Sequence, residues 1–146
     1  MTSAPQDPPS LPRPAERPDA DVVLYDGDCG ICTRQVSRLP WWDCQQRLAY
    51  LSIHDPEVAE RWPELDHQRL QREMCIVDSR GRRHWGPYAI RRLTVRLRRL
   101  WWATWLLYLP GAMWLAKPIY RWVAENRYRL SGGGCDSGAC RVPPRR

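Results

Sequence analysis

The amino-acid sequence predicts one α/β domain in which a mixed β-sheet is flanked by helices. Short apolar runs of strand length recur along the chain, stretches with helical spacing of apolar residues separate them, and the last two runs form a predicted hairpin. A chain of 146 residues is long enough to bury a core without metal or disulfide support. The expected order is strand, helix, strand, helix, strand, strand, helix, which several α/β folds share.

The domain is expected to begin with a strand over residues 22–25, an apolar run of Val, Val, Leu and Tyr. Helical spacing follows over residues 30–39, and Pro40 is expected to end that helix because proline lacks a backbone donor. A polar turn over residues 43–47 leads to a second predicted strand over residues 48–53.

A second helix is expected to start at Asp55, whose side chain is typical of an N-cap. Pro56 then takes the first helical position, and Glu57 places an acid in the first turn. Pro63 limits this helix, and the pattern over residues 65–72 is ambiguous.

The second half of the domain is predicted to contain a hairpin followed by helices. Residues 74–78 form a short apolar strand, residues 79–81 a turn, and residues 82–85 the antiparallel partner. A terminal helix is predicted from Pro118 onward. Between the hairpin and this terminal helix, helical spacing places four apolar side chains on one face: Ile90, Leu93, Leu97 and Leu100.

Composition sets the expected boundaries of the domain. Residues 1–20 contain six prolines and few core-forming residues, so we expect a disordered leader. Residues 131–146 are rich in Gly, Cys, Pro and Arg and are expected to be a flexible tail, which leaves residues 21–130 as the folded domain. The leader lacks the apolar core of a secretory signal, and the cytoplasm is the expected compartment.

Charge is unevenly distributed along the chain. Residues 80–146 carry 15 Lys and Arg against two acidic residues, a net charge of +13, whereas residues 1–79 carry eight Arg against 14 acidic residues, a net charge of −6. A basic half can attract an acidic partner or acidic lipid headgroups, although a solvated arginine-rich helix face is the simpler interpretation. Nucleic acid is not an expected partner.

Residues 100–116 contain no charged side chain and include several tryptophans. Pro110 and Gly111 interrupt this run of 17 residues, whereas a membrane span needs about 20 continuous apolar residues. We expect two short helices packed on the sheet, with an apolar patch in peripheral contact with a membrane as the alternative.

The strongest chemical signal is DGDCGIC at residues 26–32, between the first strand and the first helix. Cys29 would lie at the helix N-terminus, where unpaired N–H groups and the macrodipole stabilise a thiolate. Cys32 lies one turn further on, shares the apolar spacing of Val36 and Leu39, and should point inward. A thiol so placed can attack a mixed disulfide formed on Cys29.

Two segments together resemble a known family. They are VLYDGDCGIC at residues 23–32 and YRWVAENRYRL at residues 120–130, and they resemble the DCC family of thiol-disulfide oxidoreductases. The resemblance covers residues 21–135 and implies a thioredoxin-like mixed sheet flanked by helices, with an extra helical segment at the C-terminus. It also implies a protein-disulfide oxidoreductase with Cys29 as nucleophile, Cys32 as resolving thiol and no tightly held cofactor.

The expected partners are those of a dithiol enzyme. They are a disulfide-containing protein or small-molecule substrate, and an electron donor or acceptor that the sequence does not identify. Thioredoxin-like proteins usually carry a proline just before the strand that faces the C-x-x-C pair. Residues 72–74 read Arg-Glu-Met at this position, so the family's substrate groove is not carried over to this chain.

Asp26 and Asp28 have two open interpretations. Either carboxylate could accept a proton from Cys32 during attack on the mixed disulfide. Alternatively, Asp26 supplies turn chemistry and Asp28 caps the helix. A carboxylate near Cys29 would also oppose thiolate formation by like-charge repulsion. We favour function for Asp26, because the resemblance includes that position, and weigh both interpretations equally for Asp28.

Two other classes of function would use the same residues. Cys29 and Cys32 could join Cys135 and Cys140 in a four-thiolate zinc site, within a non-catalytic binding module whose basic face recruits membrane or an acidic partner. Residues 26–28 also look like the opening of haloacid-dehalogenase-type phosphatases, but the sequence lacks a suitably placed downstream lysine and acidic pair. The remaining cysteines of the domain are interpreted as structural thiols: Cys44 and Cys75.

Overall fold

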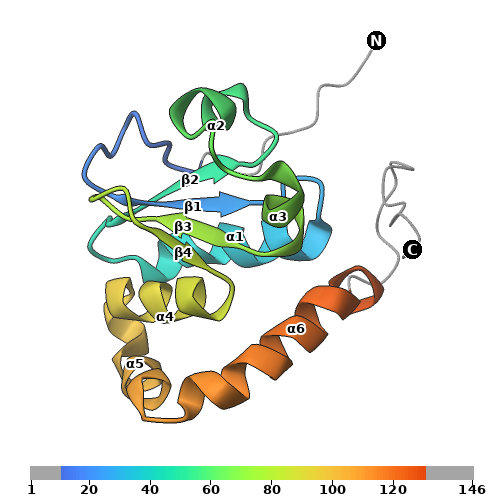
Figure 1. The fold of residues 1–146 in the computed structure, drawn as a ribbon. Coiled ribbons are helices and arrows are strands. Elements are labelled where there is room, and N and C mark those ends of the chain that lie inside the picture. Colours follow the sequence, from blue (N-terminus) through green and yellow to red (C-terminus); the bar gives the residue numbers. More distant parts are fainter. Residues whose placement is uncertain (1–10, 131–146) are drawn as a thin grey trace.

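A computed structural model describes residues 11–130 of the chain (Figure 1). This part forms a four-stranded sheet and six α-helices, with one short 3-10 helix, η1, before the fifth. The elements are β1 (Asp21–Tyr25), α1 (Gly30–Trp42), β2 (Leu48–Ser52), α2 (Pro56–Arg61), α3 (His67–Arg72), β3 (Cys75–Val77), β4 (Arg83–Trp85), α4 (Pro87–Arg96), η1 (Arg98–Leu100), α5 (Trp101–Tyr108) and α6 (Ala112–Leu130).

The sheet has the strand order β2-β1-β3-β4. β1 and β2 are parallel and connected through α1, whereas β3 is antiparallel to both β1 and β4. The predicted hairpin is therefore confirmed. Its turn is held by Asp78, whose carboxylate accepts hydrogen bonds from the amides of Arg80 and Arg82, each at 2.9 Å. This mixed sheet with flanking helices confirms the predicted α/β class and is consistent with a thioredoxin-like fold.

Alternate side chains of β1 face two different helix layers, as the pleat of a strand requires. Val22 and Leu24 pack in one cluster with Val58 of α2 and Leu70 of α3. Val23 packs on the other face of the sheet, among side chains of α1 and α4. The core therefore has two halves, one on each side of the sheet.

The two short helices on the first face begin where capping chemistry places them. The carboxylate of Asp55 accepts the amide of Glu57 at 2.9 Å, which confirms the predicted N-cap of α2. Asp66 caps α3 in the same way through the amide of Gln68. The ambiguous stretch before β3 is therefore a helix of six residues.

Two prolines do not have the effect predicted for them. α1 continues past Pro40 to Trp42, because proline removes only one amide donor and the half-buried Trp42 packs with Leu39 on the core. The last helix starts at Ala112, so Pro118 lies inside it and does not begin it.

Residues 11–20 pack against the edge of the sheet and are not a disordered leader. β2 is an edge strand, and the amide of Tyr50 donates to the carbonyl of Pro12 at 2.9 Å. Arg17 donates to the carbonyl of Leu48 at 2.7 Å and to the carboxylate of Asp43 at 3.3 Å. Residues 1–10 and 131–146 lie outside the described residues.

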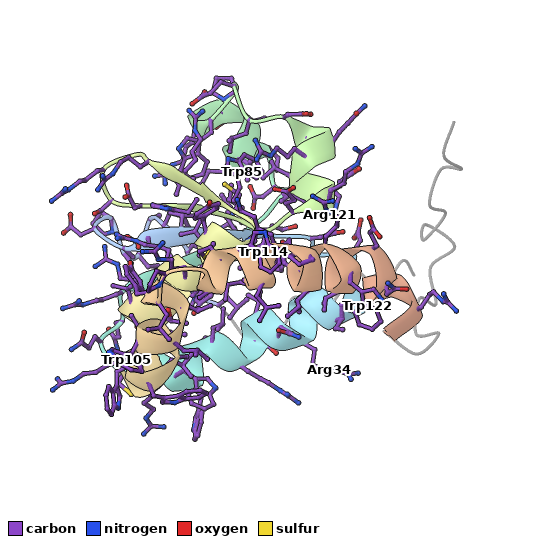
Figure 2. All side chains as sticks on the ribbon, turned by 60° about the horizontal axis from the view of Figure 1, so that its bottom comes forward. Arg34, Trp85, Trp105, Trp114, Arg121 and Trp122 are labelled. Carbon is purple, nitrogen blue, oxygen red and sulfur yellow. The ribbon has the colours of Figure 1, made fainter. Side chains whose placement is uncertain are left out.

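The helices α5 and α6 form an outer layer beyond α4 and α1 (Figures 1 and 2). The expectation that the tryptophan-rich run packs on the sheet is wrong, because Trp101, Trp105 and Trp114 are 72%, 71% and 82% exposed. α4 and α1 already cover this face of the sheet, so the later helices reach only the outside of that layer. Within residues 11–130, no helix combines the length and apolar character needed to cross a bilayer.

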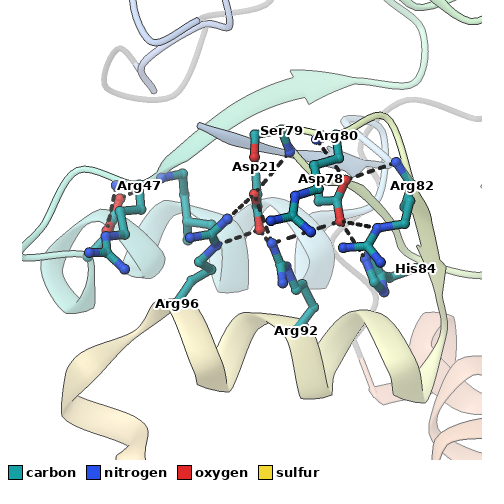
Figure 3. Close-up of polar contacts among 11 residues, drawn as sticks. Asp21, Arg47, Asp78, Ser79, Arg80, Arg82, His84, Arg92 and Arg96 are labelled. Atoms are coloured by element: carbon teal, nitrogen blue, oxygen red, sulfur yellow. Dashed lines mark hydrogen bonds and ion pairs between the residues drawn. The ribbon is translucent and has the colours of Figure 1, made fainter. Parts of the chain in front are cut away.

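A buried carboxylate at the start of β1 joins α4 to the sheet (Figure 3). Asp21 is fully buried and accepts hydrogen bonds from Nε of Arg92 and from Nε of Arg96, each at 2.7 Å. Burial raises the pKa of Asp21, but the hydrogen bonds from Arg96 and Arg92 outweigh burial and hold this pKa below its usual value. The cluster fixes α4 over the sheet at the end remote from the cysteines.

Candidate functional site

The C-x-x-C turn lies at the end of the sheet where β1 and β2 both finish (Figure 1). These strands are parallel and Tyr25 pairs with Ser52, so the segments that follow them emerge side by side. Cys29 is the N-cap residue of α1, and its amide donates to the carbonyl of Asp26 at 3.2 Å. The expected position of Cys29 at the helix start is therefore confirmed.

The burial of Cys32 differs from the prediction. Cys29 is 1% exposed, whereas Cys32, which was expected to point inward, is only half-buried. Cys32 does share a helix face with the buried Val36, but it lies in the first turn of α1, where the neighbouring strand has already ended at Tyr25. The turn of residues 26–28 instead folds back toward Cys29.

A histidine joins the two aspartates of the turn. Nε2 of His54 lies 3.1 Å from Oδ1 of Asp26 and 3.2 Å from Oδ2 of Asp28. The Asp26 side chain is 8% exposed and that of Asp28 is 71% exposed, so the imidazole bridges a buried and a solvated carboxylate. The ring of His54 also meets the ring of His67, the first residue of α3, edge-on at 5.8 Å.

Sequence reasoning missed His54. The signal that could have identified it is its position two residues after β2, because a parallel partner of β1 brings its following loop beside the loop that carries the cysteines. Recognising that signal required knowing which strand pairs with β1.

The local geometry of the turn separates the roles of the two aspartates. Oδ1 of Asp26 accepts the amide of Asp28 at 3.1 Å, so the turn chemistry predicted for Asp26 is present. Asp28 does not cap α1, because Cys29 holds the N-cap position and no side chain makes a capping hydrogen bond there. A Cβ at Gly27 would lie 2.7 Å from Oγ of Ser52, so glycine permits the close approach of this turn to β2.

The bridging histidine and the two aspartates are also a candidate cation site. The ligand atoms of Asp26, Asp28 and His54 lie within 4.8 Å of one another, and oxygen and imidazole ligands suit several divalent ions. This set contains no thiolate and is distinct from the four-thiolate zinc site considered above. Cys135 and Cys140 lie outside the described residues, so that zinc site stays a prediction.

The other two described cysteines, Cys44 and Cys75, are not part of the C-x-x-C turn. Cys75 is fully buried in β3, and burial raises the pKa of its thiol to about 12. Cys44 is exposed in the loop after α1. A thiol with so high a pKa stays protonated near neutral pH, in agreement with a structural role for Cys75.

The segment that replaces the thioredoxin-like proline lies at the same end of the sheet. Leu24 pairs with Cys75, so Met74, which directly precedes β3, lies beside the end of β1. The amide of Met74 donates to the hydroxyl of Tyr120 in α6 at 3.0 Å, a hydrogen bond that proline could not make. The two segments on which the family resemblance rests, residues 23–32 and 120–130, therefore meet near this end of the sheet.

The fold and the turn define a class of protein, namely an α/β domain that presents two cysteines at the start of the helix following its first strand. The family model for DCC1-like thiol-disulfide oxidoreductases matches residues 23–133. The chain belongs to the DCC1-like thiol-disulfide oxidoreductase family. This membership confirms the resemblance and supports a general thiol–disulfide function. No curated protein and no solved structure matches the chain significantly.

Proposed function

We propose that this chain is a dithiol oxidoreductase in which Cys29 attacks a substrate disulfide and Cys32 resolves the mixed disulfide. The observation that carries the proposal is the position of Cys29 as the N-cap of α1, with Cys32 one turn further along the same helix. Amide groups at a helix N-terminus stabilise a thiolate, and the family is one of thiol–disulfide chemistry.

Reduction of a substrate takes two exchange steps. The Cys29 thiolate attacks one sulfur of the substrate disulfide, a mixed disulfide forms, and the other substrate sulfur leaves as a thiolate. Cys32 then loses its proton and attacks the Cys29 sulfur, which releases the second substrate thiol and leaves a Cys29–Cys32 disulfide. Two electrons pass from the protein to the substrate, and a separate thiol reductant returns them.

Asp26 is the proposed acceptor of the Cys32 proton. Its carboxylate is buried at the turn that precedes α1, in the same loop as Cys29. A hydrogen on Nε2 of His54 can bond to this carboxylate at 3.1 Å and orient it, so His54 is a proposed positioning residue. Asp28 competes for the same imidazole nitrogen at 3.2 Å and thereby adjusts how firmly Asp26 is held.

Cys29 must become accessible before it can attack. Its side chain is 1% exposed, whereas Gly27 and Asp28 of the preceding turn are exposed. Displacement of this turn would open the sulfur without disturbing the strands. The proposed substrate is a disulfide-containing protein or small molecule, and the proposed compartment is the cytoplasm, where a thiol reductant is available.

Trapping tests the proposal. The Cys32→Ser variant should accumulate a mixed disulfide on Cys29 with its substrate, and peptide mass spectrometry would identify both halves. The Cys29→Ser variant should accumulate none. Cys44→Ser, which changes an exposed thiol away from the turn, is the matched control and should reduce a small aromatic disulfide as the native protein does. Adducts on Cys32 of the Cys29→Ser variant alone would reverse the assignment, and native protein that reduces no disulfide would refute the function.

A further inference from the structure

The outer helices carry large apolar side chains that point away from the domain. In α5 these are Trp101, Trp102, Trp105 and Leu106, all more than half exposed. In α6 the exposed apolar side chains recur at the same helical spacing. We call the two sets together the apolar face; its members in α6 are Trp114, Leu115, Ile119, Trp122 and Val123.

The residues on the opposite side of each helix are the ones that face the domain. The half-buried residues of α5 include Ala103 and Leu107, and those of α6 include Ala116 and Tyr120. Small residues and the anchored Tyr120 hydroxyl therefore turn toward the domain, while the tryptophans turn to solvent. Figure 2 shows Trp105 on α5 and Trp114 and Trp122 on α6. This arrangement is the reverse of a helix that stabilises a core.

The surface around the apolar face is basic. The sequence from residue 79 to residue 124 contains no acidic residue. Arg98, Arg99, Lys117 and Arg121 are exposed on η1 and α6. The guanidinium of Arg99 lies over the ring of Trp41, 4.9 Å from its centroid, so basic and aromatic side chains intermix.

We propose that the apolar face binds the surface of an anionic lipid bilayer, with α5 and α6 lying in the interface. Exposed tryptophans suit the boundary between headgroups and acyl chains, and neighbouring Arg and Lys attract anionic headgroups. A second copy of this chain fits the surface poorly, because it would bring the same positive charge against itself. The proposal requires peripheral attachment only, since no described helix could cross the bilayer. It is independent of the thiol chemistry proposed above.

Sedimentation of the full chain with vesicles tests the proposal. The native protein should bind vesicles of phosphatidylcholine containing phosphatidylglycerol and bind pure phosphatidylcholine vesicles at least about tenfold more weakly. The Trp114→Ala, Trp122→Ala double variant should lose about tenfold or more in affinity, because two large side chains no longer enter the interface. Both tryptophans are exposed, so circular dichroism and the unfolding midpoint should stay unchanged.

Charge variants separate the basic contribution from the apolar one. Arg98→Gln with Arg99→Gln should weaken binding to the anionic vesicles by about tenfold and leave weak binding to neutral vesicles unaltered. The matched control is Arg61→Gln with Arg72→Gln, on the helices of the other sheet face, and it should bind as the native protein does. Native tryptophan fluorescence should shift to the blue on vesicle addition and be quenched by brominated lipid.

Two outcomes would overturn the proposal. One is the absence of sedimentation and of any fluorescence shift with anionic vesicles. The other is a concentration-dependent dimer in buffer that the Trp114→Ala, Trp122→Ala variant abolishes, which would assign the apolar face to a second copy of the chain.

Discussion

Nε2 of His54 lies 3.1 Å from Oδ1 of Asp26, and these residues follow two neighbouring parallel strands. The contact therefore depends on the pairing of β1 with β2 and not on nearness in the chain. A buried carboxylate held by an imidazole has a fixed orientation, which a proton acceptor needs. The contact between His54 and Asp26 therefore makes His54 the first residue to substitute in a test of the proton-acceptor role of Asp26.

Replacing His54 with Leu should slow the resolution step about tenfold, because Asp26 loses the hydrogen bond that orients it. Stopped-flow measurement of mixed-disulfide decay would give this rate. His67→Leu is the matched control, since His67 meets the ring of His54. Unchanged decay in His54→Leu, or equal slowing in both variants, would argue against the positioning role.

Asp26→Asn should slow resolution by about 100-fold or more, because an amide cannot accept the Cys32 proton. Asp28→Asn should change the rate by less than about threefold, since its side chain is 71% exposed and solvated. Quenched-flow trapping of the mixed disulfide measures both. A larger effect from Asp28→Asn would transfer the proton-acceptor role to that residue.

The strands and the helix start could be predicted because they depend on local patterns. A short apolar run followed by DGDC places Cys29 at the start of α1, and this prediction needs no information about tertiary contacts. His54 could not be predicted in this way, since its contact with Asp26 arises from strand pairing. The burial order of Cys29 and Cys32 also depends on where β1 ends beneath α1 and how the preceding turn folds back.

The tryptophan-rich run shows a second limit of sequence patterns. A stripe of apolar residues at helical spacing looks the same whether it meets a core or faces solvent. Trp101 and Trp114 were expected to pack on the sheet, yet Leu93 and Leu97 of the preceding segment already fill that position. Which apolar segment covers the sheet depends on the tertiary arrangement of the helices, which the spacing of apolar residues alone does not specify.

Asp21→Asn should destabilise the domain by about 3–5 kcal/mol, because it leaves two arginines beside a buried neutral group. Arg92 and Arg96 both donate to this carboxylate, whose side chain is fully buried. Urea unfolding monitored by tryptophan fluorescence measures the loss. Arg13→Gln is the control: Arg13 pairs with Asp55 at the surface and should change stability by less than about 1 kcal/mol. A loss below about 1 kcal/mol in Asp21→Asn would contradict the assigned role of the cluster.

The folded state should lose stability in acid because Asp78, which is buried at the β3–β4 turn, becomes protonated. Burial raises the pKa of this carboxyl, but hydrogen bonds from the Arg82 amide, the His84 ring and the Arg80 amide outweigh burial and lower the pKa to about 2. A lowered pKa stabilises the folded state above the unfolded pKa of about 3.9. The contribution, about 2–3 kcal/mol, should be present at pH 5 and be lost as pH falls from about 4 to about 2.

Unfolding midpoints in urea from pH 6 to pH 2 would measure this acid dependence. Asp78→Asn should be less stable than the native protein at pH 6 and should lose less stability on acidification. Parallel curves for the two proteins would show that other carboxyl groups carry the acid dependence.

Tyr120→Phe tests how α6 is joined to the sheet. The Tyr120 hydroxyl accepts the Met74 amide at 3.0 Å, and removing it leaves that partly buried amide without this acceptor, which should cost about 1–3 kcal/mol. Because Met74 directly precedes β3, its amide should exchange with deuterium faster in the variant, while the amides of the central strand β1 keep their protection. Hydrogen-exchange mass spectrometry distinguishes this local loosening from a global loss of stability.

The ring of Tyr120 also lies against Gly86, where an added Cβ would come within 3.3 Å of the ring. The Phe side chain preserves that packing, so the substitution tests the hydroxyl alone. Unchanged exchange at Met74 would mean that the ring alone, and not the hydrogen bond, holds α6 beside the C-x-x-C end of the sheet.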